Sequence, residues 1–111
     1  MEKTIVGLTE RITVFGDSHK EVIARVDTGA TKSSIDSNLA KELKLGPVLE
    51  SKLVKTAHGN KLRPIIKAKI RIQDKIFEMK FTLSDRHHMR YRVLIGQNIL
   101  KKGFLIDPSK K

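Results

Sequence analysis

The 111-residue sequence lacks cysteine and tryptophan, and its aromatic side chains are one Tyr and four Phe. Without cysteine the chain can form no disulfide framework, no thiolate metal site and no cysteine nucleophile, which excludes disulfide-stapled miniproteins, zinc ribbons and thiol enzymes. The first residues show no signal-peptide pattern, and no apolar run approaches the ~18–20 residues of a membrane-spanning helix. We therefore expect a soluble, cytoplasmic protein without a membrane partner.

Acidic residues are also scarce relative to basic ones, because 23 Lys and Arg face 12 Asp and Glu, for a formal net charge of +11. A charge of this sign attracts nucleic acid and acidic proteins or peptides. The lysines are scattered rather than gathered in a block, and few aromatic residues are available to stack on bases. Nucleic acid therefore stays open as a partner but is not favoured, and a solvated basic surface explains most of the charge.

Short apolar runs separated by turn residues predict one domain over residues 1–111 that is mainly β. A helix is expected over residues 37–43, with Ser37 as its cap, and a second between Gly96 and Gly103. Residues 52–66 read as part of a hairpin that turns at Gly59. These elements predict a small closed β barrel with one or two short helices. The expected strands are 4–8, 11–15, 21–26, 51–56, 61–72, 76–83, 91–95 and 104–106.

The segment Asp27-Thr28-Gly29-Ala30 is the most informative one for chemistry. An acidic residue at the end of an apolar strand, followed by a hydroxyl residue and a glycine, can be held rigidly by its own turn. The Gly29 N–H is placed to bond the carboxylate, and the Thr28 hydroxyl can bond a second strand or chain. Taken alone, the same three residues also fit an ordinary turn in which Asp27 caps its own backbone.

Five blocks in the same order resemble the retropepsin-like aspartic proteases, and within them the family associated with RimK/LysX-type glutamate ligases, often labelled "ATP-dependent zinc protease". The blocks are Asp27-Thr28-Gly29-Ala30, Arg63-Pro64-Ile65-Ile66, Leu83-Ser84-Asp85-Arg86 with Met89, Val93-Leu94-Ile95-Gly96, and Phe104-Leu105-Ile106-Asp107-Pro108. They cover nearly the whole chain. The resemblance implies an acid-protease barrel and an aspartic endopeptidase that hydrolyses peptide bonds.

In such proteases two carboxylates share one proton and activate a water molecule between them. The sequence contains a single Asp-Thr-Gly, so the resemblance implies a homodimer in which Asp27 of each subunit meets on a two-fold axis. Catalysis is assigned to Asp27, Thr28 and Gly29. No cofactor is expected.

The resemblance also implies a flap, the hairpin of residues 52–66, that closes over substrate. Substrate contacts are expected from Ala30 and Thr31 and from the hairpin tip. The tip residues are Ala57, His58, Gly59 and Asn60. Leu94, Ile95, Gly96 and Gln97 are expected to support the site from below. Gln97 and Thr31 stand where viral relatives carry an ion pair, and they could bond to each other instead.

The charge and the resemblance together suggest an acidic or glutamate-modified peptide or protein as substrate, and a functional link to an ATP-grasp glutamate ligase. Lys32 adds positive charge beside the site. Arg63-Pro64 and Asp85-Arg86 are interpreted as structural or substrate-positioning residues, with a salt bridge between Asp85 and Arg86 as the plainer alternative. The four histidines lack the spacing of a zinc site, so no metal is expected. Two alternatives to the protease remain: a non-catalytic dimeric module that binds protein or nucleic acid, and, less favoured, a zinc-dependent protease.

Overall fold

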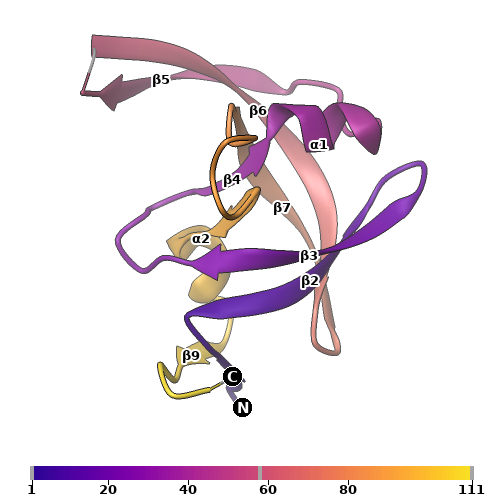
Figure 1. The fold of residues 1–111 in the computed structure, drawn as a ribbon, viewed down its shortest axis with the longest axis vertical. Helices are drawn as coiled ribbons and strands as arrows, with labels where there is room; N and C mark the ends of the chain where they lie inside the picture. The colour runs from indigo at the N-terminus through magenta and orange to yellow at the C-terminus, as the bar shows by residue number, and fades with distance from the viewer. Residues whose placement is uncertain (1, 58, 111) are drawn as a thin grey trace.

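The computed structural model describes residues 2–57 and 59–110, with 54% of residues in strands and 9% in helices (Figure 1). The strands are β1 (Thr4–Val6), β2 (Thr9–Phe15), β3 (His19–Val26), β4 (Ser33–Asp36), β5 (Glu50–Thr56), β6 (Gly59–Ile72), β7 (Lys75–Ser84), β8 (Val93–Ile95) and β9 (Phe104–Ile106), and the helices are α1 (Ser37–Glu42) and α2 (Gln97–Leu100). The expected mainly β fold with two short helices is confirmed.

Six strands close into a barrel. They follow the order β2-β3-β8-β4-β7-β6, and β6 then returns to β2 through the pairs Ile12↔Ile72 to Phe15↔Lys69. Strand β5 pairs only with the first half of β6, so the β5–β6 hairpin projects from the barrel (Figure 1). Strands β1 and β9 form a separate parallel pair near the two termini. The closed barrel predicted from the strand spacing is therefore confirmed.

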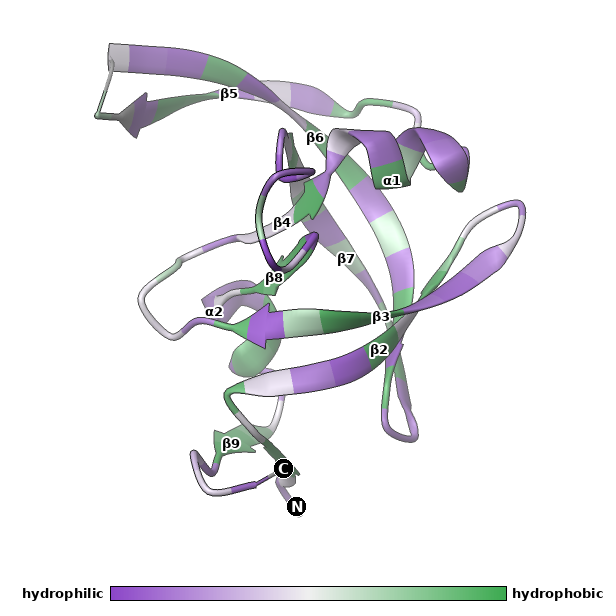
Figure 2. Ribbon diagram, viewed as in Figure 1, coloured by the Kyte–Doolittle hydropathy of each residue, from purple (hydrophilic) through white to green (hydrophobic). Residues whose placement is uncertain are grey.

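The core follows from alternation along the strands. In β6, Ile66, Ala68, Ile70 and Ile72 are buried and the residues between them are exposed, which appears as alternating colours along this strand in Figure 2. Successive side chains of a strand point to opposite faces, so this pattern places one apolar face inside the barrel. Phe81 of β7 is the bulkiest of the fully buried side chains described.

Strand β4 was not among the predicted strands. Its sequence, Ser33-Ser34-Ile35-Asp36, is mostly polar, yet Ser33 and Asp36 are fully buried and the strand pairs with both β7 and β8. Side-chain hydrogen bonds satisfy these polar groups, which a hydrophobicity pattern cannot reveal. The predicted cap of α1 was also wrong by one residue, since the Asp36 carboxylate, not Ser37, accepts the bond from Leu39 N.

Candidate active site

The Asp27 loop begins where β3 ends against β8. The parallel pairing Val26↔Ile95 continues into a bond from Asp27 N to Ile95 O of 2.9 Å. The Asp27 carboxylate is half-buried, and its Oδ1 accepts a hydrogen bond from Gly29 N at 2.9 Å. Because Thr28 and Gly29 are exposed, the loop presents the carboxylate at the surface while its own backbone orients it.

Gly96 allows the Asp27 loop to lie directly on the start of α2. A Cβ atom at Gly96 would stand 2.3 Å from Lys32 O and 2.9 Å from Ala30 O, so only glycine fits this contact. Gln97 N donates to Ala30 O at 2.8 Å, and Ile95 lies beneath with 1% of its surface exposed. Leu94 is half-buried beside it. The predicted supporting residues therefore lie against the loop.

The Gln97 side chain has a different partner from the expected one. Its Nε2 donates to the carbonyl oxygen of Thr28 at 2.7 Å rather than to Thr31. The contact of Thr31 with this segment is made by backbone, from Asn98 N to Thr31 O at 3.2 Å. These two neutral hydrogen bonds, to the carbonyl oxygens of Thr28 and Thr31, hold the loop at the place where viral proteases are expected to carry an ion pair.

Sequence reasoning missed a buried link between β4 and α2. The Ser33 hydroxyl donates to Asn98 Oδ1 at 2.7 Å and accepts from Gly96 N at 2.9 Å. Asn98 Nδ2 also donates to Lys80 O at 3.1 Å. Only the closed barrel shows that the Ser33 hydroxyl points inward and bridges two elements.

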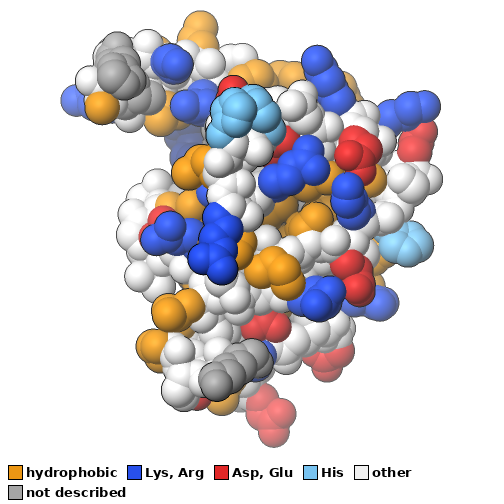
Figure 3. All heavy atoms as spheres, viewed as in Figure 1, with side chains coloured by type: hydrophobic (Ala, Val, Ile, Leu, Met, Phe, Trp, Pro, Cys, Tyr) orange, Lys and Arg blue, Asp and Glu red, His pale blue; other side chains and the backbone are white. Residues whose placement is uncertain are grey.

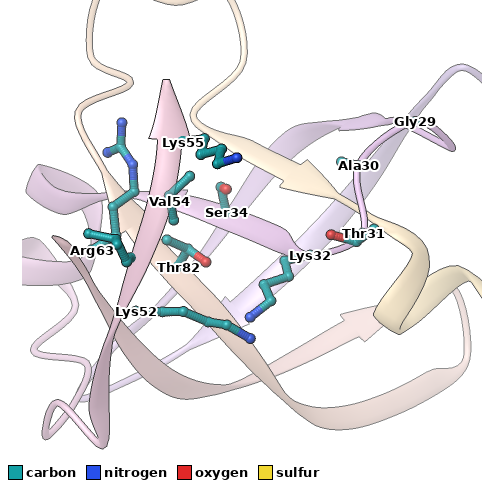
Figure 4. Close-up of a pocket in the computed structure, with 11 residues that line it drawn as sticks. Gly29, Ala30, Thr31, Lys32, Ser34, Lys52, Val54, Lys55, Arg63 and Thr82 are labelled. Carbon is teal, nitrogen blue, oxygen red and sulfur yellow. The ribbon is translucent and has the colours of Figure 1, made fainter. Parts of the chain in front are cut away.

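A cavity of about 590 Å³ lies between the Asp27 loop and the projecting hairpin, and the hollow is visible below the hairpin in Figure 3. Gly29, Ala30 and Thr31 line one side of it, as Figure 4 shows. The hairpin contributes its strands rather than its tip. Its lining residues are Lys52, Leu53, Val54, Lys55 and Arg63.

The predicted tip contacts lie elsewhere. Ala57, Gly59 and Asn60 are exposed and do not line this cavity in the single chain, and His58 lies outside the described residues. Their contact with substrate therefore stays a prediction. The lining takes four consecutive residues of β5, numbers 52–55, so the alternation of this strand gave no signal for it.

The cavity is strongly cationic. Lys32, Lys52, Lys55 and Arg63 line it together with uncharged residues. Lys32 and Lys52 reach toward one another in Figure 4, and the neighbouring Lys52 is the main reason that the pKa of Lys32 is lowered, with desolvation adding to it. Two ammonium groups held this close repel each other, so an anion placed between them would be stabilised.

A buried charge network stands behind the site. Asp36 is fully buried and accepts bonds from Arg86 N at 2.8 Å and from Arg92 Nη2 at 2.9 Å. Burial alone would raise the pKa of Asp36, but the bonds from Arg86 and Arg92 lower it overall. Sequence reasoning did not single out Asp36 or Arg92, because neither lies in a recognisable motif.

Arg86 takes part in this network and not in a pair with Asp85, so the alternative of an Asp85–Arg86 salt bridge is wrong. Its Nε donates to Tyr91 O at 3.1 Å, while Asp85 bonds the His87 ring instead. Burial lowers the pKa of Arg86, as does the charge of Arg25, whereas Asp36 and Asp27 raise it. The charge of Asp27 therefore acts on the pKa of the buried Arg86 side chain.

Among the described residues, one group of side chains has ligand atoms within metal-binding distance of one another, namely Asp36, Asp85 and His87 within 4.8 Å. Asp36 Oδ1 already accepts from Arg86 N, and its Oδ2 accepts from Leu39 N and from the Arg92 guanidinium. A cation would have to displace these donors and face the guanidinium charge, so the residues do not fit a zinc site. Within the part of the chain that the structure describes, no helix is long and apolar enough to cross a membrane.

Relatives and solved structures extend this picture. The chain is 30% identical over 112 aligned positions to a probable alpha-L-glutamate ligase of Shewanella pealeana, covering 78% of this chain and 24% of the relative. A probable alpha-L-glutamate ligase of Desulfotalea psychrophila is 30% identical over 64 residues, or 57% of this chain and 14% of the relative. The chain thus spans a quarter or less of these curated relatives.

Three solved structures share the fold. A Legionella pneumophila protein of unknown function superimposes with a TM-score of 0.71 at 21% identity, covering 97% of this chain and 95% of that one. The EIAV protease in complex with an inhibitor gives 0.67 at 18% identity and 84% coverage of both chains. Simian foamy virus protease gives 0.65 at 18% identity, with 84% and 91% coverage.

A family model described as "RimB-like: Retropepsin-like aspartic endopeptidase RimB" matches residues 36–111, which is more than half of the chain. The match includes the Arg86 segment, the Gly96 turn and α2, and it begins after the Asp27 loop. The fold, with its closed barrel and its likeness to retroviral proteases, agrees with it. The chain therefore belongs to the RimB-like family of retropepsin-like domains.

Proposed function

We propose that the chain is one subunit of a homodimeric aspartic endopeptidase whose catalytic dyad pairs Asp27 with Asp27 of the partner subunit. The observation that carries this proposal is the Asp27 loop, in which Gly29 N orients the carboxylate at 2.9 Å beside a cavity large enough for peptide side chains. Catalytic groups need this kind of fixed placement next to a substrate-sized cleft.

The chemistry follows from two carboxylates at one site. Like charges a few ångströms apart do not both ionise, so the pair holds one proton at working pH. The ionised carboxylate takes a proton from a water molecule while the water oxygen attacks the scissile carbonyl carbon. The protonated carboxyl donates its proton to the carbonyl oxygen, which gives a neutral tetrahedral intermediate. The carboxyl group that gained its proton from water then donates that proton to the amide nitrogen, while the other, now ionised, carboxylate takes a proton from a hydroxyl of the intermediate. The C–N bond breaks, which releases the amine and the carboxylic acid products and returns the pair to its starting state with one proton.

The homodimer is required because the sequence holds a single Asp-Thr-Gly. Thr28 and Gly29 are exposed in the single chain, which leaves this edge of the loop available to a second copy. The bond from Gln97 to Thr28 O holds the same edge in place. We assign dyad support to Thr28 and Gly29, and support of the loop from below to Leu94, Ile95, Gly96 and Gln97.

The β5–β6 hairpin is proposed as the flap. It projects from the barrel and forms the wall of the cavity opposite Ala30 and Thr31 (Figure 4). Closing it over a bound peptide would exclude bulk water and bring the tip, residues 57–60, onto the substrate.

The substrate proposed is a peptide or protein with acidic side chains near the cleaved bond. Four basic residues line the cavity, and the network behind it includes the buried Arg86. The matched relatives are named as glutamate ligases, which supports a link to glutamate-modified substrates made by such an enzyme. Cleavage of a glutamate-bearing peptide should weaken as salt increases, since exposed charges are screened.

The test is cleavage of a diverse peptide mixture, read by mass spectrometry from pH 3 to 8. Wild type should cut and Asp27→Asn should not, whereas Asp17→Asn, which lies in an exposed turn without the following glycine, should cut normally. Pepstatin should inhibit and EDTA should not. Cutting by Asp27→Asn, or its loss in EDTA, would overturn the proposed mechanism.

A non-catalytic binding module is the second candidate, and one finding favours it: the family match begins at residue 36, beyond the Asp27 loop. In that case Asp27 only closes its turn. Binding of an acidic protein or a nucleic acid would then be unchanged in Asp27→Asn, and neither protein would cut any peptide. Filter binding with random RNA and DNA at physiological salt measures the affinity for nucleic acid.

A further inference from the structure

The cationic cavity beside Asp27 continues into two further cavities on the outer surface of the barrel. The second, of about 250 Å³, shares Thr31, Lys32, Lys52 and Thr82 with the first. The third, of about 310 Å³, shares Lys80 and Asn98 with the second. Because consecutive cavities share lining residues, they form one groove that runs from beneath the β5–β6 hairpin, across β7, to α2.

The outer half of this groove is basic as well. Beyond the four cations of the first cavity, the second adds Lys80 and the third adds Lys67, Lys101 and Lys102. Two carboxylates accompany them. Glu50 lies 3.9 Å from Lys80, and Glu78 lines the third cavity. We call the segment lined by Lys67, Lys80, Lys101 and Lys102 the outer groove.

The barrel brings like charges together in this outer groove. Lys67 of β6 and Lys80 of β7 are directly paired across the two strands, and both are exposed because their neighbours Ile66 and Phe81 face the core. Like charges directly opposite each other on a sheet are destabilising. Lys32 and Lys52, which reach toward one another from a loop and a strand, are a second place where two ammonium groups repel, and a bound chain of negative charges would relieve both repulsions.

We infer that the outer groove is an exosite for an acidic peptide segment that lies outside the cleaved bond, in the same substrate whose scissile bond reaches Asp27. This inference rests on the proposed function and adds to it a second binding region, outside the cavity beside Asp27. An extended peptide advances about 3.3 Å per residue and its side chains alternate between two sides, so every second carboxylate of a glutamate run can face the lysines along the groove.

An acidic peptide fits the groove better than a nucleic acid does. The aromatic residue that lines these three cavities is Phe81, and its side chain is only 1% exposed. Bases therefore find no aromatic face to stack on along the described lining, and stacking provides much of the affinity for single strands. The second cavity also shares Thr31 and Lys32 with the cavity beside Asp27, so a substrate segment bound in the groove lies next to the candidate cleavage site.

The test compares two peptides that share one cleavable core and differ in an appended run of glutamates or of glutamines. The exosite variant is Lys67→Gln with Lys101→Gln and Lys102→Gln. The control variant removes the same charge from exposed positions outside the three cavities, as Lys3→Gln with Lys41→Gln and Lys44→Gln.

For the glutamate-tailed peptide the exosite variant should show a KM about tenfold higher and an unchanged kcat, because three exposed charge contacts are lost. The glutamine-tailed peptide should be cut equally by wild type and by both variants. An equal rise in KM in the exosite and control variants would show that only net charge matters and would overturn the inference. Equal KM values of wild type for the glutamate-tailed and glutamine-tailed peptides would overturn it as well.

Direct binding separates this inference from the proposed function. A fluorescent glutamate peptide should bind wild type in an anisotropy assay and bind the exosite variant about tenfold more weakly, even if no peptide is ever cut. If no peptide is cut but the binding difference remains, the proposed protease function is refuted and the exosite is not. Tighter binding of an RNA oligonucleotide that depends on the same three lysines would show a nucleic-acid track and overturn the peptide assignment.

Discussion

Replacing Asp36 tests whether the buried charge network stabilises the fold around the candidate site. In Asp36→Ala three kinds of donor lose their acceptor: Leu39 N at the start of α1, the buried Arg86 N, and the Arg92 guanidinium. Loss of the helix cap costs about 1 kcal/mol. An unsatisfied buried N–H at Arg86 costs about 1–3 kcal/mol. The Arg92 side chain is 32% exposed and can turn to water, so its loss adds less than about 1 kcal/mol.

We therefore expect Asp36→Ala to lower the free energy of unfolding by about 3–4 kcal/mol, and Asp36→Asn, which keeps one acceptor oxygen, by about 2 kcal/mol. The assay is urea denaturation at one fixed protein concentration, because any association between subunits would make the measured stability depend on concentration. Asp74→Ala, in an exposed turn, is the control and should stay within about 0.5 kcal/mol of wild type. A loss below about 1 kcal/mol in Asp36→Ala would refute the network as a source of stability.

The same residue predicts a pH dependence. The pKa of Asp36 is lower in the folded protein than its ordinary value, so its contribution is fully present above the unfolded pKa of about 3.9 and is lost as pH falls through the lower folded pKa. The difference in stability between wild type and Asp36→Asn should accordingly be constant near neutral pH and shrink in acid. A difference that stayed constant to the lowest pH at which the protein folds would contradict this assignment.

Three further predictions concern the loop and the cavity. Gly96→Ala should abolish cleavage and destabilise the fold, because the Cβ atom of the alanine would stand 2.3 Å from Lys32 O. Thermal melting and a peptide cleavage assay measure this, and a variant that is as stable and active as wild type would contradict the close packing. Gln97→Ala should lower kcat several-fold with a loss of stability of about 1 kcal/mol, as the bond to Thr28 O is removed, and Gln97→Glu, which cannot donate that bond, should behave alike. Lys52→Gln should raise the pKa of Lys32 towards its ordinary value, since Lys52 is the main cause of its lowering; NMR titration of the Lys32 side chain measures this, and an unchanged or lower pKa would contradict the pairing.

Much of the fold was predictable because its signals are local. The apolar alternation that marks β6 and β7, the turn residues between them and the glycines that bound α2 all lie within a few positions of one another. Strand β4 escaped prediction for the opposite reason. Its residues Ser33 and Asp36 are acceptable inside the barrel only through partners 50 to 65 positions away, such as Arg86 and Asn98.

The candidate site divides in the same way. Asp27-Thr28-Gly29 was recognisable as a short string, and Gly96 followed from the apolar pair before it. The basic wall was not, because Lys32, Lys52 and Arg63 come from a loop and two strands and meet only where the hairpin folds over the Asp27 loop. The partner of Gln97 was also predicted wrongly, since the choice between Thr28 and Thr31 depends on a backbone path that no spacing rule defines.

The sequence by itself determined the strand alternation, the carboxylate-bearing turn, the single copy of Asp-Thr-Gly and the excess of positive charge. These are properties of neighbouring residues or of composition. Only the tertiary structure decided where that charge gathers, which carboxylate is buried and which groups satisfy it. Contacts such as Lys67 with Lys80 and Asp36 with Arg92 join residues distant in sequence, and they exist because barrel closure, driven by burial of the apolar faces, brings those strands together.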